Sequence, residues 1–335
     1  MNEEEKLKKF SFVIPVYNGG KHLDCCLRSI RYQDYQQGEV EIIVIDGGSS
    51  DDTLGISRSF ACKILDNPRK LAEYGVQIGV KEARGEFLVI FAADNELFGK
   101  DWLKKVADIF KSEPGVSAVW GRLASGEKDS SLNKYFELIQ SDPLNWFLNK
   151  NLNEYRKKAK SSGKDYFAFT VDPAKPLVWG ANGIVYKTEK IKEIWSQKGY
   201  LGDNDAFQFM IEKGDNKAAY FDSAFVYHHH VARLWDWIKK WRRNLNQHLI
   251  DKQDTRNMNW VFTGNFYRKL FFWSIYSAVP IPALIHSLYL CLKSKNLYWF
   301  YHPLASCAQF WTYVSLIAST SKGRAFIMKS FKTER

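Results

Sequence analysis

The strongest constraint on the fold is a repeat within residues 10–110, where short, mostly apolar runs alternate with segments of helical periodicity. The runs are four to seven residues long and rich in Val, Ile and Phe, which is typical of strands buried on both faces. The predicted strands are residues 10–16, 41–45, 62–65 and 87–91, and the predicted helices are residues 21–33, 49–61, 71–83 and 101–110. Repeated strand–helix units indicate the α/β class, with a mostly parallel sheet flanked by helices.

The pattern changes after this repeat. Residues 124–175 are polar and interrupted by proline and glycine, so we expect a surface excursion with one helix over residues 132–148. Regular structure is expected to resume at residues 177–180. It continues with helices over 190–195 and after Asp203, a strand over 220–227 and a basic, aromatic helix over 234–248.

Charge divides the chain unevenly. The formal net charge is +11, but residues 1–225 carry 32 Lys/Arg against 33 Asp/Glu, whereas residues 226–335 carry 16 against 4. The last third also contains 22 of the 52 aromatic residues. A basic, aromatic-rich segment fits nucleic acid, through phosphate charge and base stacking, or an anionic membrane surface.

Two charge-free segments distinguish these partners. Residues 270–292 and 296–321 contain no Lys, Arg, Asp or Glu, and each exceeds the roughly 20 residues that cross a bilayer. Proline interrupts both, so two spans, a pair of half-immersed helices and two core helices of a soluble bundle remain open. The segments are bordered by basic residues, which favours an anionic membrane surface: Arg268, Lys269, Lys293, Lys295, Lys322 and Arg324. No helix-turn-helix, zinc-finger or RNA-recognition signature supports nucleic acid.

The cysteines and the N-terminus bear on the compartment. Five cysteines form no C-x-x-C pair, and an odd number suggests a reducing environment. Residues 1–9 are polar and no apolar core follows them, so no secretory signal is expected. We therefore expect the chain at the cytoplasmic face of the cell membrane.

Two predicted strands end in carboxylates. Asp46 follows the second strand and Asp94 follows the fourth, and ligands of open α/β sheets bind at the carboxyl ends of strands. Neither aspartate follows a glycine-rich dinucleotide or phosphate loop. One carboxylate could accept from a base or ribose and the other could hold a divalent cation on a diphosphate, while each alone could be a turn former.

At these positions the chain resembles family-2 glycosyltransferases of the GT-A fold, the fold of nucleotide-diphospho-sugar transferases. The similarity covers about residues 10–245, with the motifs in the family's order. The segments that carry it are Phe-Val-Ile-Pro-Val-Tyr-Asn (12–18), Leu-x-x-Cys-Leu-x-Ser-Ile (23–30), Glu-Ile-Ile-Val-Ile-Asp-Gly-Gly-Ser-Ser-Asp-Asp-Thr (41–53), Ala-Ala-Asp-Asn (92–95), Trp-Gly-Ala-Asn-Gly (179–183) and Gly-Asp-Asn-Asp (202–205).

The resemblance implies a role for each matching residue. Asp46 would bind the base or ribose of the donor, and Asp94 would hold Mg²⁺ or Mn²⁺ on its diphosphate. Asp203 would be the general base, with Asp205 as the substitute. The remaining donor side would consist of Pro15, Tyr17, Asn18, Ala93, Asn95, Arg242 and Arg243, and the acceptor side of Trp179, Gly180, Ala181 and Asn182. A membrane-facing or solvated patch is an equal interpretation of the two arginines.

Two departures and one histidine run qualify this assignment. Ala92 replaces the first acid of the family's Asp-x-Asp motif, and Gly202 replaces an acid common before the base. His228 and His230 would face one side of an extended chain, where they could ligate the metal or form a structural cluster.

The sequence thus predicts an inverting, metal-dependent glycosyltransferase that moves a sugar from a nucleoside diphosphate donor to a lipid-linked or membrane-presented glycan acceptor. The alternative is a membrane scaffold that keeps the fold and binds nucleotide-sugar without turnover, which Ala92 motivates. Binding of nucleic acid is a third, weak hypothesis. The predicted parts are a GT-A catalytic domain (1–230), a basic, aromatic connector (231–265) and a membrane-associated helical hairpin (266–335).

Overall fold

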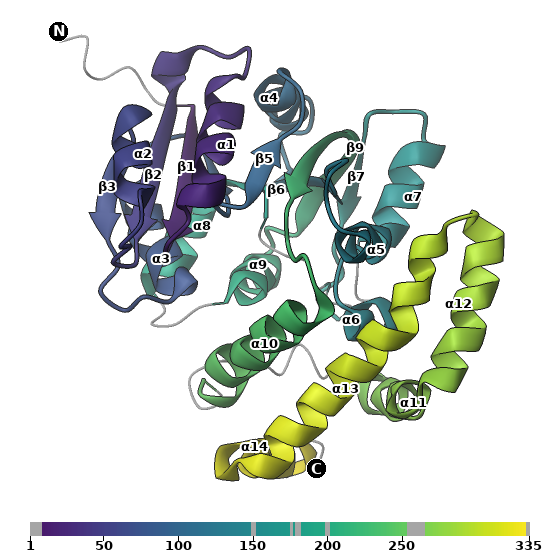
Figure 1. The fold of residues 1–335 in the computed structure, drawn as a ribbon. Coiled ribbons are helices and arrows are strands. Elements are labelled where there is room, and N and C mark those ends of the chain that lie inside the picture. Colours follow the sequence, from purple (N-terminus) through teal and green to yellow (C-terminus); the bar gives the residue numbers. More distant parts are fainter. Residues whose placement is uncertain are drawn as a thin grey trace, which may run out of the picture. The chain divides into compact units, whose positions relative to one another are not determined.

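The computed structural model describes residues 9–148, 152–174, 177, 182–197, 202–252 and 265–332. Backbone contacts group them into two compact units (Figure 1). Unit 1 lies within residues 1–126, 152–173 and 180–229, and unit 2 within residues 127–151, 174–179 and 230–335. Unit 1 ends at residue 229, one residue before the expected end of the catalytic domain at residue 230. Residues 127–151 were expected in the catalytic domain, but they group with the C-terminal helices.

Unit 1 is built on one nine-stranded sheet with the order β3-β2-β1-β4-β8-β6-β9-β5, and β7 also pairs with β9. The strands are β1 (Phe10–Val16), β2 (Val40–Asp46), β3 (Lys63–Asp66), β4 (Phe87–Ile90), β5 (Asn95–Leu97), β6 (Ala118–Ala124), β7 (Tyr166–Thr170), β8 (Ile184–Lys187) and β9 (Lys217–His228). Strands β1 to β4 are mutually parallel, as the strand–helix repeat predicts. Strands β5, β6, β7 and β8 were not predicted, and the antiparallel pairs all involve them.

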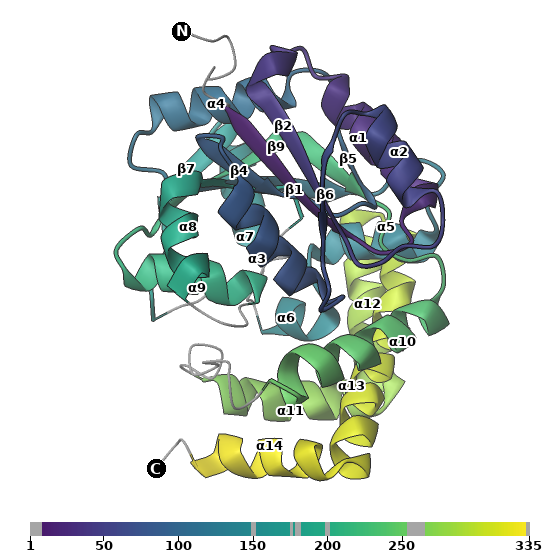
Figure 2. The ribbon, with the colours of Figure 1, turned by 90° about the vertical axis from the view of Figure 1, so that its left-hand side faces the viewer.

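Helices cover both faces of this sheet (Figure 2). Those of unit 1 are α1 (Gly20–Arg31), the short η2 (Gln37–Glu39), α2 (Thr53–Ser59), α3 (Ala72–Glu82), α4 (Trp102–Ser112), α7 (Asn153–Ser161), α8 (Thr188–Gln197) and α9 (Asp203–Glu212). Helices α1 and α4 share one apolar core with the strands, whereas α3 packs on the opposite face beside α8. Side chains of β1 alternate between these layers, with Phe12 and Ile14 facing α1 and α4 and Val13 facing α3.

Unit 2 is helical. It consists of α5 (Ser131–Ile139), α6 (Pro143–Phe147), α10 (Leu234–Asn244), the π-helical η3 (Leu245–Ile250), α11 (Phe266–Ala278), α12 (Pro280–Ser294), η5 (Leu297–Phe300), α13 (Tyr301–Ser319) and α14 (Ser321–Lys332). The single helix expected over 132–148 is divided, because Gln140 takes a left-handed conformation and Asp142 caps a new helix with Pro143 in its first turn.

The charge-free segment 270–292 is also divided. Val279 is extended and Pro280 begins α12, so α11 and α12 meet at an angle of 93°. Over the described part of the chain, no single helix is long and apolar enough to cross a membrane. The bent pair α11–α12 qualifies by length and composition alone.

Candidate active site

Strand directions bring the predicted ligands to one edge of the sheet. Strand β4 is parallel to β1 and antiparallel to β8, β8 is antiparallel to β6, and β6 is parallel to β9. Strand β9 therefore runs in the same direction as β1 and β2. The carboxyl ends of β2, β4 and β9 carry Asp46, Asp94 and His228, and β8 starts at this edge just after Asn182.

Asp46 is buried at the end of β2, with 5% of its surface exposed. Its Oδ2 accepts from the backbone N–H groups of Gly48 and Ser49, each at 3.0 Å. Gly48 has φ +86°, a conformation that glycine adopts without steric cost. The carboxylate thus holds the β2–α2 turn closed, which leaves it oriented at the sheet edge rather than free to rotate.

The β1–α1 turn is tied to the β2–α2 turn. The backbone N–H of Asn18 donates to Ser49 Oγ and its Oδ1 accepts from the Ser50 N–H, both at 2.8 Å. Asn18 takes a left-handed φ of +48°, which asparagine tolerates better than most residues. Tyr17 is 59% exposed beside it, and Pro15 is half-buried within β1. The predicted donor residues of the first motif therefore form a rigid loop with one exposed aromatic ring.

Asp94, His228 and Asn182 come together although they are distant in sequence. The Nε2 of His228 lies 3.8 Å from Asp94 Oδ2 and 3.3 Å from Asn182 Nδ2. Pairing of β5 with β9 aligns Asn95 with His228, and the His229 N–H donates to the Asp94 carbonyl oxygen at 3.1 Å. The backbone thus holds the aspartate beside the histidine.

A neighbouring pair was not predicted as functional. His229 Nε2 lies 3.1 Å from Glu96 Oε1, and its ring stacks on His22 with centroids 6.3 Å apart. Glu96 is two residues beyond Asp94 on β5, so both acids border this edge. The sequence offered one signal for this pair. His229 is the middle residue of the run 228–230, and neighbouring residues of a strand face opposite sides, so it could have been assigned a partner of its own.

Other predicted residues are placed as follows. Asn95 is fully buried in the sheet and Ala93 is half-buried. Asp203 is the first residue of α9, whereas Asp205 is 2% exposed and its Oδ2 accepts from the Gly202 N–H at 3.2 Å. Asp205 therefore caps the helix, which leaves Asp203 the stronger candidate for the base.

The remaining predicted site residues lie in unit 2 or outside the residues that the structure describes. Arg242 donates to Ser315 Oγ at 3.0 Å, and Arg243 is exposed on the same helix. The backbone N–H of His230 donates to Asn133 Oδ1, and its Nδ1 lies 3.3 Å from Lys240 Nζ. Trp179, Gly180 and Ala181 lie outside the described residues.

The metal prediction can be compared with the side chains at this edge. Within the described ranges, no group of three or more His, Cys, Asp or Glu side chains is arranged to hold an ion. The pair Asp94 and His228 supplies one oxygen and one nitrogen ligand 3.8 Å apart. Mg²⁺ commonly takes one or two carboxylates and completes its shell with water and substrate phosphates, so the Asp94 carboxylate fits an ion that arrives with a diphosphate.

Residues 11–170 match the sequence profile of glycosyl transferase family 2. This region belongs to that family. The resemblance read from the strand-end motifs is therefore confirmed, and the matched region is a glycosyltransferase domain that includes Asp46 and Asp94.

Similar curated proteins are glycosyltransferases of several kinds. A dolichyl N-acetyl-α-D-glucosaminyl phosphate 3-β-D-2,3-diacetamido-2,3-dideoxy-β-D-glucuronosyltransferase of Methanococcus voltae is 30% identical over 144 residues, which cover 40% of this chain and 44% of that protein. A PGL/p-HBAD biosynthesis glycosyltransferase of Mycobacterium bovis is 33% identical over 118 residues, covering 33% of this chain and 45% of that protein. The chain spans less than half the length of these relatives.

A solved structure supports the fold over most of the chain. The mannosyltransferase PcManGT from Pyrobaculum calidifontis, in complex with GDP-Man and Mn²⁺, superposes with a TM-score of 0.52 at 15% identity, covering 92% of this chain and 88% of that chain. The predicted GT-A fold class is therefore confirmed, with a curled sheet flanked by helices.

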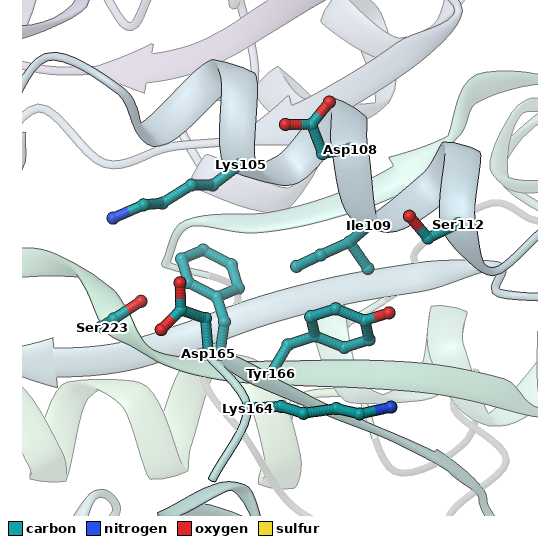
Figure 3. Close-up of a pocket in the computed structure, with 9 residues that line it drawn as sticks. Lys105, Asp108, Ile109, Ser112, Lys164, Asp165, Tyr166 and Ser223 are labelled. Carbon is teal, nitrogen blue, oxygen red and sulfur yellow. The ribbon is translucent and has the colours of Figure 1, made fainter.

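The glycosyltransferase unit also contains a cavity of about 430 Å³ between α4 and the start of β7 (Figure 3). Its lining includes Lys105 and Asp108 from α4, Asp165 and Tyr166 from the β7 side, and Ser223 from β9. None of the predicted site residues lines it, so this cavity is separate from the cluster of Asp94, His228 and Asn182.

Proposed function

We propose that this chain is an inverting, metal-dependent glycosyltransferase. It transfers a sugar from a nucleoside diphosphate donor to a lipid-linked or other membrane-presented acceptor, at the cytoplasmic face of the cell membrane and in glycan biosynthesis. The observation that carries the proposal is the meeting of Asp46, Asp94 and His228 at one sheet edge of a domain from glycosyl transferase family 2.

The donor nucleotide would be held by the two linked turns. Asp46 is fixed by two backbone N–H groups, and each carboxylate oxygen can accept more than one hydrogen bond. It therefore retains capacity for a base N–H or ribose hydroxyl. Tyr17 presents an exposed ring on the adjacent turn, where a base could stack.

The diphosphate would be held through a divalent cation at Asp94 and His228. A bound Mg²⁺ or Mn²⁺ would neutralise the negative charge that develops on the leaving group. Asn182 lies against the same Nε2 of His228 and would yield this contact to the cation, while the bond from the His229 N–H to the Asp94 carbonyl oxygen fixes Asp94 beside the histidine.

Asp203 would act as the general base. Direct displacement at the anomeric carbon inverts its configuration and requires the acceptor hydroxyl to lose its proton as it attacks. Residues 179–182 would border the acceptor.

The acceptor class is inferred from two sources. The Methanococcus voltae relative is named for a dolichyl-linked substrate, and unit 2 presents many exposed apolar side chains. A lipid-linked acceptor suits an enzyme held at a membrane.

The metal and donor roles predict the behaviour of Asp94→Ala. We expect donor hydrolysis or transfer to fall at least about 100-fold, and EDTA to inhibit the unmodified protein but not the residual activity. The control is Glu189→Ala, an exposed acid at the start of α8 on the opposite edge of the sheet, which should stay near the unmodified level. The metal assignment would be overturned if activity were unchanged both in the Asp94→Ala variant and in the unmodified protein treated with EDTA. Calorimetric binding of UDP or GDP with Mn²⁺ to the unmodified chain, without any hydrolysis or transfer, would favour the scaffold.

The base assignment predicts a contrast between two aspartates of α9. Asp203→Asn should cut transfer by about 100-fold or more while donor affinity stays within about twofold, because the base acts on the acceptor. Asp205→Ala should instead lower the free energy of unfolding by about 1 kcal/mol through loss of the cap. Titration calorimetry, transfer assays and urea unfolding measure these quantities. Loss of donor binding in Asp203→Asn would remove that residue from the base role.

A further inference from the structure

Exposed large apolar side chains are concentrated in unit 2. Of the nineteen in the described residues, fifteen lie between Phe271 and Val314. Ten of them are on α11 and α12 or at their junction: Phe271, Phe272, Ile275, Val279, Ile281, Leu284, Ile285, Leu288, Tyr289 and Leu292. Exposed apolar side chains concentrated on two consecutive helices mark an interaction site rather than ordinary scatter.

The packing of α12 is reversed relative to a helix of a water-soluble protein. Ala283, Ser287 and Cys291, spaced four residues apart, face the protein and are buried. Ile285 and Leu292 face outward with 64% and 81% of their surfaces exposed. Helices pack through small residues and point large apolar ones outward where the surrounding solvent is lipid.

Charge identifies the kind of apolar partner. Residues 270–292 carry no charged side chain, whereas Arg268 precedes them and Lys293 and Lys295 follow them, all exposed. The whole stretch 255–333 contains no Asp or Glu. Cations at the ends of an apolar surface are complementary to anionic lipid headgroups, whereas a protein partner would not require this arrangement.

The bend sets the depth of insertion. Helices α11 and α12 have 13 and 15 residues, hence lengths of about 20 and 23 Å. Two such legs meeting at 93° and tilted equally reach about 14–16 Å below their ends. This matches one half of a hydrocarbon core of about 30 Å. The corner, with Val279 51% exposed and Ile281 64% exposed, is apolar, and the basic residues are at the far ends of the legs.

We propose that α11 and α12 form an elbow that enters a single leaflet of an anionic bilayer, corner first, and returns to the same side. Val279 lies near the bilayer midplane, and Arg268, Lys293 and Lys295 remain at the headgroups. The elbow adds to the proposed function the way in which the chain binds the membrane. It rests on the proposed function only for which membrane is bound.

Flotation with vesicles tests whether the elbow binds lipid. Full-length protein should float with phosphatidylglycerol–phosphatidylcholine vesicles. Ile285→Asp should reduce the bound fraction at least about tenfold, since an ionised side chain is costly in hydrocarbon. Tyr32→Asp is the matched control, because Tyr32 is 60% exposed in unit 1 against 64% for Ile285. Equal flotation of the two variants would overturn the proposal.

Depth measurements test the single-leaflet geometry. Nitroxide labels at Val279→Cys and Leu292→Cys, with Cys25, Cys62 and Cys307 replaced by serine, report collision with oxygen and with a polar nickel complex. We expect the label at position 279 to lie about 14 Å deeper than the label at 292. Equal depths would indicate helices lying flat. The variants Arg268→Cys and Lys295→Cys place a thiol at each basic end of the elbow. If an impermeant thiol reagent added outside the vesicles labelled only one of the two, the pair would span the bilayer. Either result overturns the elbow.

The two proposals fail separately. Asp94→Ala should float like the unmodified protein, and Ile285→Asp in detergent should keep its affinity for nucleotide with Mn²⁺. Flotation without any nucleotide binding would leave the elbow standing and refute the glycosyltransferase proposal, and the reverse result would refute the elbow alone.

Discussion

The fully buried side chain of His302 shows how much one residue depends on its surroundings. Its Nδ1 lies 2.7 Å from the hydroxyl of Tyr135, and its ring packs against Trp146. Burial, reinforced by the charge of His286, lowers the pKa of His302 to about 3, and burial raises the pKa of Tyr135. Tyr135 therefore keeps its proton, and its hydroxyl is hydrogen-bonded to a neutral imidazole. This bond joins α5 to α13 within unit 2.

This histidine predicts a loss of stability in acid. The folded state keeps His302 neutral down to about pH 3, whereas the unfolded chain protonates it near pH 6.5. Between these values the unfolded state binds the extra proton, so the free energy of unfolding falls by up to about 1.4 kcal/mol per pH unit as the pH drops. Urea unfolding at several pH values measures the slope, and His302→Gln should flatten it. An unchanged slope in His302→Gln would assign the effect to other groups.

At the scale of elements, the close approach of α3 to the sheet shows why certain helix positions are glycine. A Cβ on Gly79 would lie 2.4 Å from Val13 Cγ1 and 2.8 Å from Ile45 Cδ1. A Cβ on Gly75 would lie 2.9 Å from Pro15 Cβ. Two small residues one turn apart thus let α3 lie directly on β1 and β2, which lead into the β1–α1 and β2–α2 turns.

Gly79→Ala therefore should destabilise unit 1. Crowding against both Val13 and Ile45 costs about 2–3 kcal/mol and outweighs the better helix propensity of alanine, about 1 kcal/mol, to leave a net loss of about 1–2 kcal/mol. Gly38→Ala is the control, because a Cβ there meets nothing within 4 Å, and it should change stability by less than about 0.5 kcal/mol. Thermal or urea unfolding compares them, and equal stabilities would contradict the packing argument.

At the scale of the whole molecule, both the net charge and the exposed apolar side chains are distributed unevenly along the chain. Residues 1–225 are nearly neutral, and residues 226–335 carry 16 basic against 4 acidic side chains. The sheet edge with Asp46 and Asp94 thus belongs to the balanced part. The excess positive charge accompanies the exposed apolar helices.

This distribution predicts that vesicle binding depends on salt. Each basic side chain near an anionic surface contributes about 1 kcal/mol, so Lys293→Gln with Lys295→Gln should weaken binding to phosphatidylglycerol vesicles by about tenfold or more at 0.1 M salt. The difference should shrink at 1 M salt, where the Debye length falls from about 10 to about 3 Å. Lys104→Gln with Lys111→Gln, both exposed on α4, is the control. Binding that is insensitive to salt would exclude a contribution from these lysines.

The strand–helix repeat through residue 110, the α/β class and the positions of Asp46 and Asp94 after predicted strands could be read from the amino-acid sequence. These follow from local patterns, because an apolar run that stops at an acid marks both a buried strand and its end. Three features became evident only in the folded chain: His228 lies beside Asp94 and Asn182, residues 127–148 group with the C-terminal helices, and a charge-free stretch bends at Pro280. Strand order, register and helix packing join residues more than a hundred positions apart, and no local periodicity specifies them.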